Sequence, residues 1–231
     1  MKLKTIYLMG LANGLKPRII LETLSNMPIW NERKYIYITD SYEGVSVEFC
    51  REKNIEIIII DKENMNKSIS EIKYKNNTLL ITIGWSKKVP NEFLNIFDNC
   101  INCHGGLLPD YRGNNVYMHN YANISDEYGI TIHFMNSDLD DGDILIQSNL
   151  KLYLEETPEI MHRRISEITG MIIPEAIRSI EAGYRGTKQL GKARYFFKIT
   201  REEMYELRKI NIKNIRNSEP KKIARNKEWK L

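Results

Sequence analysis

The chain has 231 residues, of which 42% are hydrophobic and 28% are charged, and this balance excludes an intrinsically disordered chain and predicts one folded domain or one domain with an appendage. The net charge is only +4, from 34 basic and 30 acidic side chains, so nucleic acid is not an expected partner. The longest apolar run, Ile57 to Ile60, is far below the roughly 20 residues of a membrane span. The first residues lack a signal-peptide pattern, so no membrane contact and a cytoplasmic location are expected.

Short runs rich in β-branched residues alternate with helix-length stretches through the first hundred residues. The predicted strands are Thr5–Met9, Tyr35–Thr39, Ile55–Ile60 and Leu79–Ile83. The predicted helices are Pro17–Ser25, Val45–Lys53, Met65–Lys73 and Asn91–Phe97. Isoleucine runs without polar alternation suit strands covered on both faces, and crossovers of this length favour parallel pairing. The predicted fold class is therefore α/β, with a Rossmann-like, open, mostly parallel sheet.

The pattern changes in the second half of the chain. Ile130–Met135 and Ile144–Leu150 are strand-like, and the acidic segment Asn136–Gly142 between them is too polar for a core. A hairpin or a mixed-sheet second half is predicted there. Thr157–Ala182 is predicted to be one long helix that ends at Gly183, because Thr157 can cap it and a proline follows in its first turn.

The C-terminal segment differs from the rest of the chain in charge. From Thr187 to Leu231 there are 14 Lys and Arg against 5 Asp and Glu, a net of +9, which leaves −5 for residues 1–186. We therefore divide the chain into a main domain, residues 1–186, and a small basic C-terminal extension, residues 187–231. From Asn217 onward a solvated, partly disordered end is favoured.

Three cysteines cannot all pair with one another. Cys100-x-x-Cys103 is the only spacing that suggests redox or zinc chemistry, and no second pair of ligands accompanies it. Neither chemistry is predicted, and no metal site is expected.

Ligands of open α/β sheets gather beyond the carboxyl ends of the strands, so the residues after Met9, Ile83 and Ile101 are of most interest. After Met9, the segment Gly10–Gly14 has glycines that suit an anion at a helix N-terminus. A simple tight turn is favoured instead, because the glycine spacing departs from the dinucleotide pattern even though Asp40 ends the second strand.

Asn102 and His104 lie on the same side of a predicted strand, because side chains alternate along a strand. An isolated pair of this kind is usually buried and satisfied by backbone groups. Here the pair ends the strand and runs into Gly105-Gly106, which lets a ligand approach the backbone closely. We interpret this segment as a candidate site.

Two ordered motifs resemble the catalytic half of the folate-dependent formyltransferases, over roughly residues 5–182. They are Asn102-x-His104-x-x-Leu107-Leu108-Pro109-x-Tyr111-Arg112-Gly113, followed by Gly129-x-Thr131-x-His133-Phe134-Met135 and Leu139-Asp140-Asp141-Gly142-Asp143-Ile144. The resemblance implies an enzyme that transfers a formyl group from N10-formyltetrahydrofolate to a primary amine. It also implies that Asn102, His104 and Asp140 are the catalytic residues.

The chemistry of formyl transfer suits these residue types. Attack of an amine on a formyl carbon develops negative charge on oxygen and positive charge on nitrogen. Asn102 and His104 can donate hydrogen bonds to the oxygen, and Asp140 can orient the imidazole and take the amine proton directly or through water. Without the resemblance, Asp140 would be interpreted as a solvated turn residue. The family alignment favours it over Asp141, because it follows Leu139 and lies two residues before Gly142.

The resemblance also implies binding residues. The formyl donor is expected to contact Trp85, Lys87, Lys88, Val89, Asp138 and Gly142. The amine substrate is expected to contact Gly105, Gly106, Tyr111 and Arg112. For residues 84–90 an ordinary strand-to-helix loop is an equally good interpretation, and Tyr111 and Arg112 are also expected to shape their own loop. Leu108-Pro109 resembles a step that is cis in some relatives, which is rare in general at ~5% of X-Pro bonds.

The other histidines have less specific interpretations. His133 lies on a predicted strand, where lining the pocket and a hydrogen-bonded core position are equally good interpretations. His119 and His162 fall on helical stretches, where an exposed or capping role is the default.

The predicted acceptor is a nucleotide-linked amino sugar, dTDP-linked by preference. Methionyl-tRNA formyltransferases carry a second domain that this chain is too short to contain, and the turn by which glycinamide ribonucleotide transformylases hold phosphate is only half present at Asn13-Gly14. Gly84-Trp85 and the segment Ala193–Phe197 more closely resemble sugar N-formyltransferases, in which the extension often supports a homodimer. Three alternatives stay open: a glycinamide ribonucleotide formyltransferase, a formyltetrahydrofolate hydrolase, and a catalytically silent folate-binding homologue.

Overall fold

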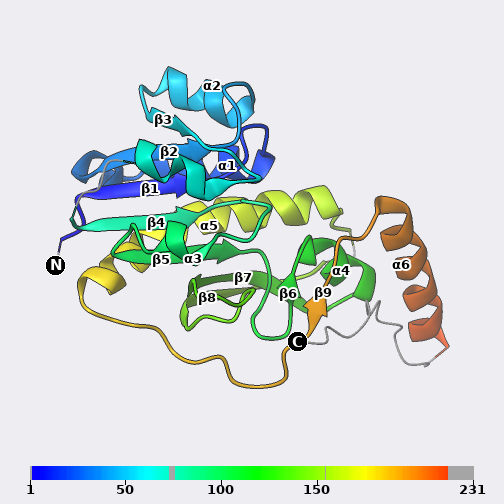
Figure 1. Cartoon of the computed structure of the whole chain (residues 1–231). Coiled ribbons are helices and arrows are strands. Elements are labelled where there is room, and N and C mark those ends of the chain that lie inside the picture. The colour runs from blue at the N-terminus through cyan, green and yellow to red at the C-terminus, as the bar shows by residue number, and fades with distance from the viewer. Residues whose placement is uncertain (1, 73–75, 154, 218–231) are drawn as a thin grey trace.

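The structure, a computed structural model, describes residues 2–72, 76–153 and 155–217. Within these ranges, seven strands form one sheet in the order β3-β2-β1-β4-β5-β7-β8 (Figure 1). These strands are β1 (Thr5–Met9), β2 (Lys34–Thr39), β3 (Glu56–Ile59), β4 (Thr78–Thr82), β5 (Asn99–His104), β7 (Glu127–Phe134) and β8 (Ile144–Lys151). The first five are parallel, and β7 and β8 continue the sheet in antiparallel pairing. The predicted α/β class with a mostly parallel sheet and a mixed second half is confirmed.

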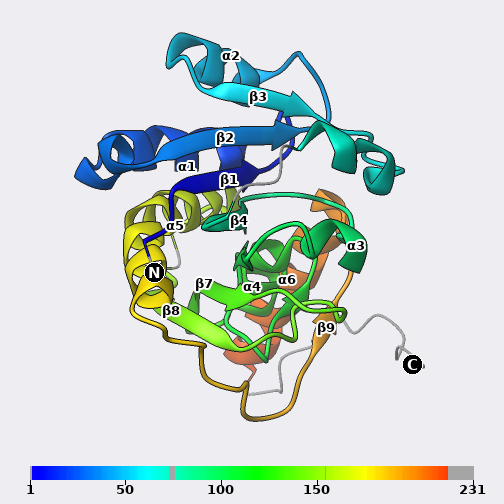
Figure 2. The same ribbon diagram turned by 60° about the vertical axis from the view of Figure 1, so that its left-hand side comes forward.

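Helices cover both faces of this sheet. The α-helices are α1 (Leu15–Ser25), α2 (Val45–Glu52), α3 (Asn91–Leu94), α4 (Val116–Asn123), α5 (Pro158–Glu181) and α6 (Arg201–Arg216), and the 3-10 helices are η1 (Pro28–Glu32) and η2 (Met65–Glu71). Figures 1 and 2 show α1 and α5 on one face and α3 on the other. Each face has its own apolar core, and the two cores are separated by the buried strands.

The central strands show why the sheet forms. Every residue of β1 and of β4 is buried, as expected for aliphatic runs covered on both faces. On the helical side, the side chain of Thr157 accepts a hydrogen bond from the backbone N–H of Ile160 and Pro158 occupies the first turn of α5. The predicted long helix is therefore observed with its predicted start.

Two predicted helices are shorter than expected. The segment predicted as Met65–Lys73 forms the 3-10 helix η2, which ends at Glu71, and Lys73 lies outside the described residues. The helix predicted as Asn91–Phe97 ends at Leu94. The chain must turn there, because the carboxylate of Asp98 accepts hydrogen bonds from the backbone N–H and hydroxyl of Thr78 just before β5 begins.

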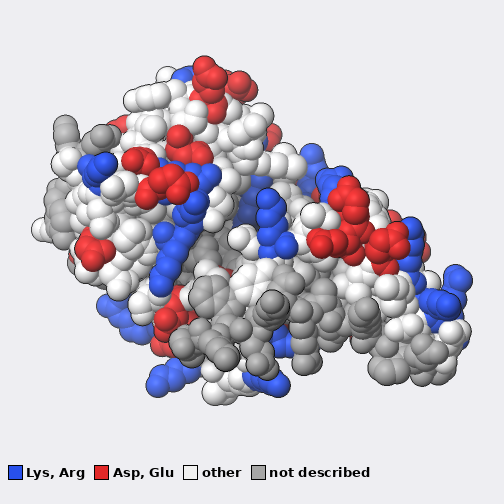
Figure 3. Space-filling view, turned by 45° about the vertical axis from the view of Figure 1, so that its right-hand side comes forward, with Lys and Arg blue, Asp and Glu red and all other residues white. Residues whose placement is uncertain are grey.

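The described part of the C-terminal segment packs on the rest of the molecule. Strand β9 (Tyr195–Phe196) pairs with β6 (Arg112–Gly113), and α6 packs against α4 (Figure 1). The division into residues 1–186 and 187–231 stays a prediction. Of the end predicted to be partly disordered from Asn217 onward, Asn217 is the C-cap of α6 and residues 218–231 lie outside the described residues. On the face in Figure 3, Lys and Arg side chains are interspersed with Asp and Glu. None of the helices in the described ranges combines the length and apolarity that crossing a membrane requires.

Candidate active site

The carboxyl ends of the central strands bring polar side chains to one edge of the sheet. Asn102 and His104 are among the last three residues of β5. Thr82 is the last residue of the neighbouring strand β4 and pairs in register with Asn102. On the other side, the antiparallel strand β7 places His133 opposite Asn102. The alternation of side chains along β5 therefore directs Asn102 and His104 toward the same side, as the sequence predicted.

Asp140 reaches this edge from the β7–β8 loop, residues 135–143. The loop closes through a hydrogen bond of 2.9 Å from the backbone N–H of Phe134 to the carbonyl of Asp143. Asp140 has φ of +52°, a left-handed conformation that aspartate tolerates better than most residues. At Gly142 a Cβ atom would lie 1.7 Å from the carbonyl oxygen of Phe134, so only glycine fits this turn.

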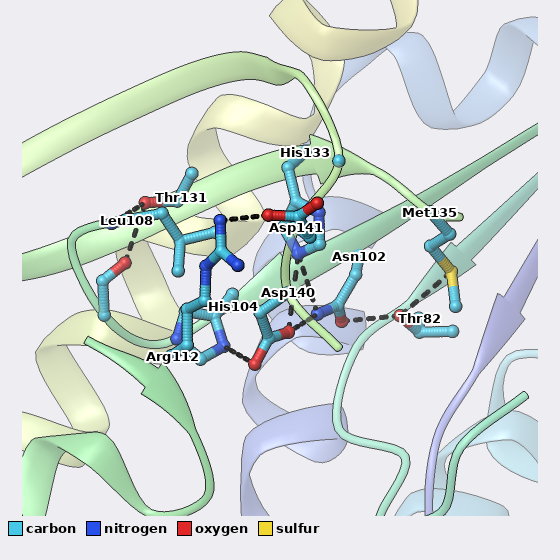
Figure 4. Close-up of polar contacts among 12 residues, drawn as sticks. Thr82, Asn102, His104, Leu108, Arg112, Thr131, His133, Met135, Asp140 and Asp141 are labelled. Atoms are coloured by element: carbon cyan, nitrogen blue, oxygen red, sulfur yellow. Dashed lines mark hydrogen bonds and ion pairs between the residues drawn. The ribbon is translucent and has the colours of Figure 1, made fainter. Parts of the chain in front are cut away.

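The predicted catalytic side chains meet in space (Figure 4). Nδ2 of Asn102 donates to Oδ1 of Asp140 at 3.2 Å, and Nδ1 of His104 lies 3.5 Å from Oδ2 of the same carboxylate. Nδ2 of Asn102 is also 3.2 Å from Nε2 of His133. The hydroxyl of Thr82 donates to Oδ1 of Asn102 at 2.6 Å. An amide, an imidazole and a carboxylate thus form one network although they are far apart in the sequence.

Carbonyl partners identify the protonated nitrogen of each histidine. Nε2 of His104 is 2.5 Å from the carbonyl oxygen of Tyr111, and Nδ1 of His133 is 2.8 Å from the carbonyl oxygen of Phe134. Because a carbonyl oxygen can only accept, both of these nitrogens carry hydrogen. Nε2 of His133 is the ring nitrogen that faces Nδ2 of Asn102.

Burial and charge act differently on the two coupled groups. Burial lowers the pKa of His104, and the opposing effect of the Asp140 carboxylate does not restore its ordinary value. For Asp140, burial acts to raise the pKa, but His104, His133 and the backbone N–H of Gly113 outweigh it. The pKa of Asp140 therefore lies well below its ordinary value. Asp140 is an anion at neutral pH, available to accept a proton or to hold a cation.

The network lies on the wall of a cavity of about 1480 Å³. Five of the residues predicted to contact the formyl donor line this cavity: Trp85, Lys87, Lys88, Val89 and Asp138. The indole Nε1 of Trp85 is buried without a hydrogen-bond partner among the described residues. Lys87 forms an exposed ion pair with Glu63 at 3.0 Å, which turns its ammonium group toward the surface. Gly142 does not line the cavity and instead supports the β7–β8 loop.

The residues predicted to contact the amine fall into two groups. Gly105 and Arg112 line the cavity, whereas Gly106 and Tyr111 lie behind its wall. The guanidinium of buried Arg112 forms an ion pair with Asp141 and also donates to Gln189 and to the hydroxyl of Tyr195. Arg112 therefore shapes the loops around the site, one of the two roles expected for it. The predicted cis peptide Leu108-Pro109 is also present.

The two helical histidines correct the sequence prediction. His119 is 1% exposed, with Nε2 donating to the carbonyl of Phe197 at 2.7 Å, because the segment before α6 covers α4. His162 lines the cavity from α5, and burial with the nearby Lys16 ammonium lowers its pKa to about 4. Neither has the exposed or capping role that is the default for a helical histidine. His133 combines both interpretations considered for it, because it is buried, hydrogen-bonded and part of the cavity wall.

Lys16 is a cavity residue that the sequence did not single out as a ligand-binding group. Its Nζ atom donates to the carbonyl oxygen of Cys103 at 2.5 Å, directly before His104 in the chain. Burial lowers the pKa of Lys16. Among the ion pairs of the described residues, none involves this ammonium group. The sequence signal was its place at the start of α1, directly after the glycine turn.

The glycine turn itself is a structural element. The backbone N–H of Ala12 donates to Asp40 at 2.9 Å, so the acidic residue that resembled part of a dinucleotide site holds the turn instead.

Burial raises the pKa of Cys100 and of Cys103 to about 12, which keeps both thiols protonated. Among the described residues, no group of three or more His, Cys, Asp and Glu side chains is arranged to hold a metal ion.

Residues 39–177 match the model of a protein family described as formyl transferase. The chain is 30% identical over 154 residues to a methionyl-tRNA formyltransferase of Borrelia garinii subsp. bavariensis, which covers 64% of this chain and 49% of the relative. It is 31% identical over 130 residues to a methionyl-tRNA formyltransferase of Methylacidiphilum infernorum, covering 55% and 41%. The chain thus spans about half the length of the curated relatives it matches.

Solved structures with a similar fold come from several formyltransferases. Glycinamide ribonucleotide transformylase 1 from Symbiobacterium toebii has a TM-score of 0.69 at 21% identity, covering 82% of this chain and 95% of the other. A sugar N-formyltransferase from a Shewanella species has a TM-score of 0.64 at 20% identity, covering 84% and 76%. At these identities the likeness concerns the fold.

Proposed function

The chain belongs to the formyl transferase family, and on this premise we propose that it transfers a formyl group from N10-formyltetrahydrofolate to the primary amine of a nucleotide-linked amino sugar. The observation that carries the proposal is the meeting of Asn102, His104 and Asp140 on the wall of one large cavity. These are the three residues that the ordered sequence motifs select.

The proposal gives each side chain one role. Asn102 and His104 lie at the end of β5, and their N–H groups donate to Asp140 and to the carbonyl of Tyr111 in this structure. In the proposed reaction Asn102 turns an N–H toward the developing oxyanion, and His104 orients the site around it. Asp140 is ionised and accepts hydrogen bonds from Asn102 and from the backbone N–H of Gly113 at 2.9 Å. A carboxylate held in this way can take the proton that the attacking amine loses. Removal of one oxyanion donor costs ~3 to 4 kcal/mol of transition-state stabilisation in comparable sites.

The cavity next to Trp85 fits the formyl donor. The buried indole Nε1 of Trp85 has no partner among the described residues, and such buried donors are normally satisfied by a ligand or water. The aliphatic side chain of Val89 and the exposed carboxylate of Asp138 border the same space. We assign this part of the cavity, with Lys87 and Lys88 at its margin, to the folate.

Lys16 supports an acceptor that carries phosphate. Its ammonium group reaches the cavity wall beside His104 and pairs there with a backbone carbonyl rather than with a carboxylate. Lys192, from the C-terminal segment, lines the same cavity. A nucleotide diphosphate would place negative charge next to Lys16, whose ammonium group forms no ion pair among the described residues. The fold neighbour named as a sugar N-formyltransferase covers 84% of this chain and is consistent with this choice. The homodimer implied by the sequence resemblance belongs to the same proposal.

The test is an acceptor panel incubated with N10-formyltetrahydrofolate and read by mass spectrometry. The panel contains dTDP-, UDP- and GDP-linked amino sugars, glycinamide ribonucleotide and methionyl-tRNA. We expect a gain of one formyl group on a nucleotide-linked amino sugar. A gain only on glycinamide ribonucleotide or on methionyl-tRNA would overturn the acceptor, and formate release without any amine would identify a hydrolase.

His104→Ala tests the site directly. The variant should abolish transfer while leaving folate binding mostly intact, because it removes the imidazole and not the pocket around Trp85. The matched control is His119→Ala, which removes a buried histidine outside the cavity and should retain transfer at a temperature where the variant stays folded. Normal turnover by His104→Ala would remove this residue from the mechanism.

A further inference from the structure

A segment of the C-terminal extension crosses beside the β7–β8 loop. We define this strap as residues 187–194. At one end Thr187 exchanges two backbone hydrogen bonds of 2.8 Å with Ile144, the first residue of β8. At the other end the backbone N–H of Arg194 donates to Pro109 at 3.3 Å, and its carbonyl accepts from Arg112 at 3.0 Å. The strap is therefore fixed at both ends.

Gln189 is the strap residue that contacts the loop. Its Nε2 donates one hydrogen bond of 2.9 Å to the carbonyl of Asp140 and another of 2.9 Å to the carbonyl of Gly142. Its Oε1 accepts from the guanidinium of Arg112 at 2.8 Å and 3.3 Å. One side-chain amide thus uses both of its N–H groups on the loop and its oxygen on Arg112.

These contacts hold the part of the β7–β8 loop that has the least favourable backbone conformation. Asp140 has a left-handed backbone conformation, which persists only when its surroundings hold it. The guanidinium of Arg112 pairs with Asp141, so the oxygen of Gln189 reaches the next residue of the loop through Arg112. The stretch from the Asp140 carbonyl to the Gly142 carbonyl is then held by Gln189, directly at the two carbonyls and through Arg112 at the Asp141 side chain.

We propose that Gln189 is a positioning residue for the transfer reaction, holding the backbone of Asp140 so that its carboxylate faces Asn102 and His104. The inference rests on the proposed function and extends it, because it makes Gln189 necessary for catalysis although Gln189 does not line the cavity. The two hydrogen bonds donated by Nε2 are the contacts that matter.

Two substitutions separate these contacts. Gln189→Glu keeps the shape of the side chain and the oxygen that binds Arg112 but replaces both donated hydrogen bonds by a carboxylate that faces two carbonyl oxygens. Gln189→Ala removes all the contacts. We expect kcat to fall about 10- to 100-fold in both variants, with KM for the formyl donor nearly unchanged, because a small displacement of a catalytic group has an effect of this size. The matched control is Leu190→Ala, the adjacent strap residue, which is 82% exposed and should keep normal kcat.

A second readout does not depend on activity. The backbone N–H of Gly113 donates to Oδ2 of Asp140 at 2.9 Å, so its hydrogen exchange reports the position of this carboxylate. We expect faster exchange at Gly113 in Gln189→Glu and not in Leu190→Ala. Unchanged exchange at Gly113 together with normal kcat in Gln189→Glu would overturn the proposal. If the wild-type protein transfers no formyl group to any acceptor, the proposed function fails, and exchange at Gly113 alone still decides the role of Gln189.

Discussion

The orientation of the Asn102 side-chain amide determines which hydrogen bonds the candidate site can donate. Oδ1 of Asn102 accepts from the hydroxyl of Thr82, so Nδ2 must face Asp140 and His133. Asn102 is thereby fixed with its N–H groups on the side where His104 also lies. Thr82 touches neither the imidazole nor the carboxylate, yet it sets the direction of the donor that the proposed chemistry uses.

Thr82→Val should lower kcat about tenfold, with a change in the free energy of unfolding of about 1 kcal/mol, because it removes one hydrogen bond without changing side-chain shape greatly. Steady-state kinetics and urea unfolding measure the two effects. The control is Thr78→Val on the same strand. The hydroxyl of Thr78 donates to Asp98 and not to Asn102, so this variant should keep normal kcat. Equal kcat in both variants would show that the orientation of Asn102 does not depend on Thr82.

At the scale of elements, the β7–β8 loop and the strap form a pair. Gly142 permits the tight approach of the loop to Phe134, and Gln189 holds it from the other side. Strand β9 continues the strap into a pairing with β6, where Gly113 has φ of +107° and a Cβ would lie 2.0 Å from the carbonyl of Phe196. The C-terminal segment is thus built into the surroundings of the candidate site.

Gly142→Ala should reduce transfer by at least about 100-fold, because the added Cβ forces the loop and Asp140 away from β7. The same clash should lower the free energy of unfolding by roughly 1 to 3 kcal/mol. Gly183→Ala provides the control, since φ is also positive there but no atom lies within 4 Å. That variant should lose a little stability through backbone strain and keep its transfer rate. If Gly142→Ala retained wild-type transfer, the loop position would not matter for catalysis.

At the scale of the whole molecule, burial holds several histidines neutral. The pKa values of His104, His119 and His162 are all lowered, with burial as the largest cause in each case, and that of His162 falls to about 4. The unfolded chain binds protons on these residues below about pH 6.5, whereas the folded protein does not. Acidification from that pH therefore favours the unfolded state. The lowered pKa of Asp140 affects stability only at still lower pH, below the ordinary value of 3.8.

The free energy of unfolding should fall as the pH drops from 7 to 4.5, with roughly 2 kcal/mol from His162 after allowance for its partial exposure. Guanidinium unfolding at both pH values measures the change. In His162→Gln the fall should be smaller by about that amount, since this residue no longer takes up a proton on unfolding. An identical pH dependence in wild type and His162→Gln would show that His162 does not contribute to the loss of stability at low pH.

Local patterns in the sequence predict much of the fold and part of the candidate site. Strands β1 and β4 follow from runs of mostly apolar residues without polar alternation, and the shared direction of Asn102 and His104 follows from the two-residue period of a strand. Helix α6 was not predicted, because the basic composition of the C-terminal segment is also typical of a solvated end. The capping box of Thr200 and Glu203, and the buried spacing of Met204, Leu207 and Asn211, were signals for it.

The sequence by itself determined the fold class, the family resemblance and the pair of polar side chains at the end of one strand. Only the tertiary structure decided that Asp140, 38 residues after Asn102, meets this pair, and that Thr82, His133 and Gln189 hold the arrangement. The physical reason is that local periodicity specifies which face a side chain occupies. Contacts between distant residues depend instead on the order of strands in the sheet and on the path of the strap that crosses beside the β7–β8 loop.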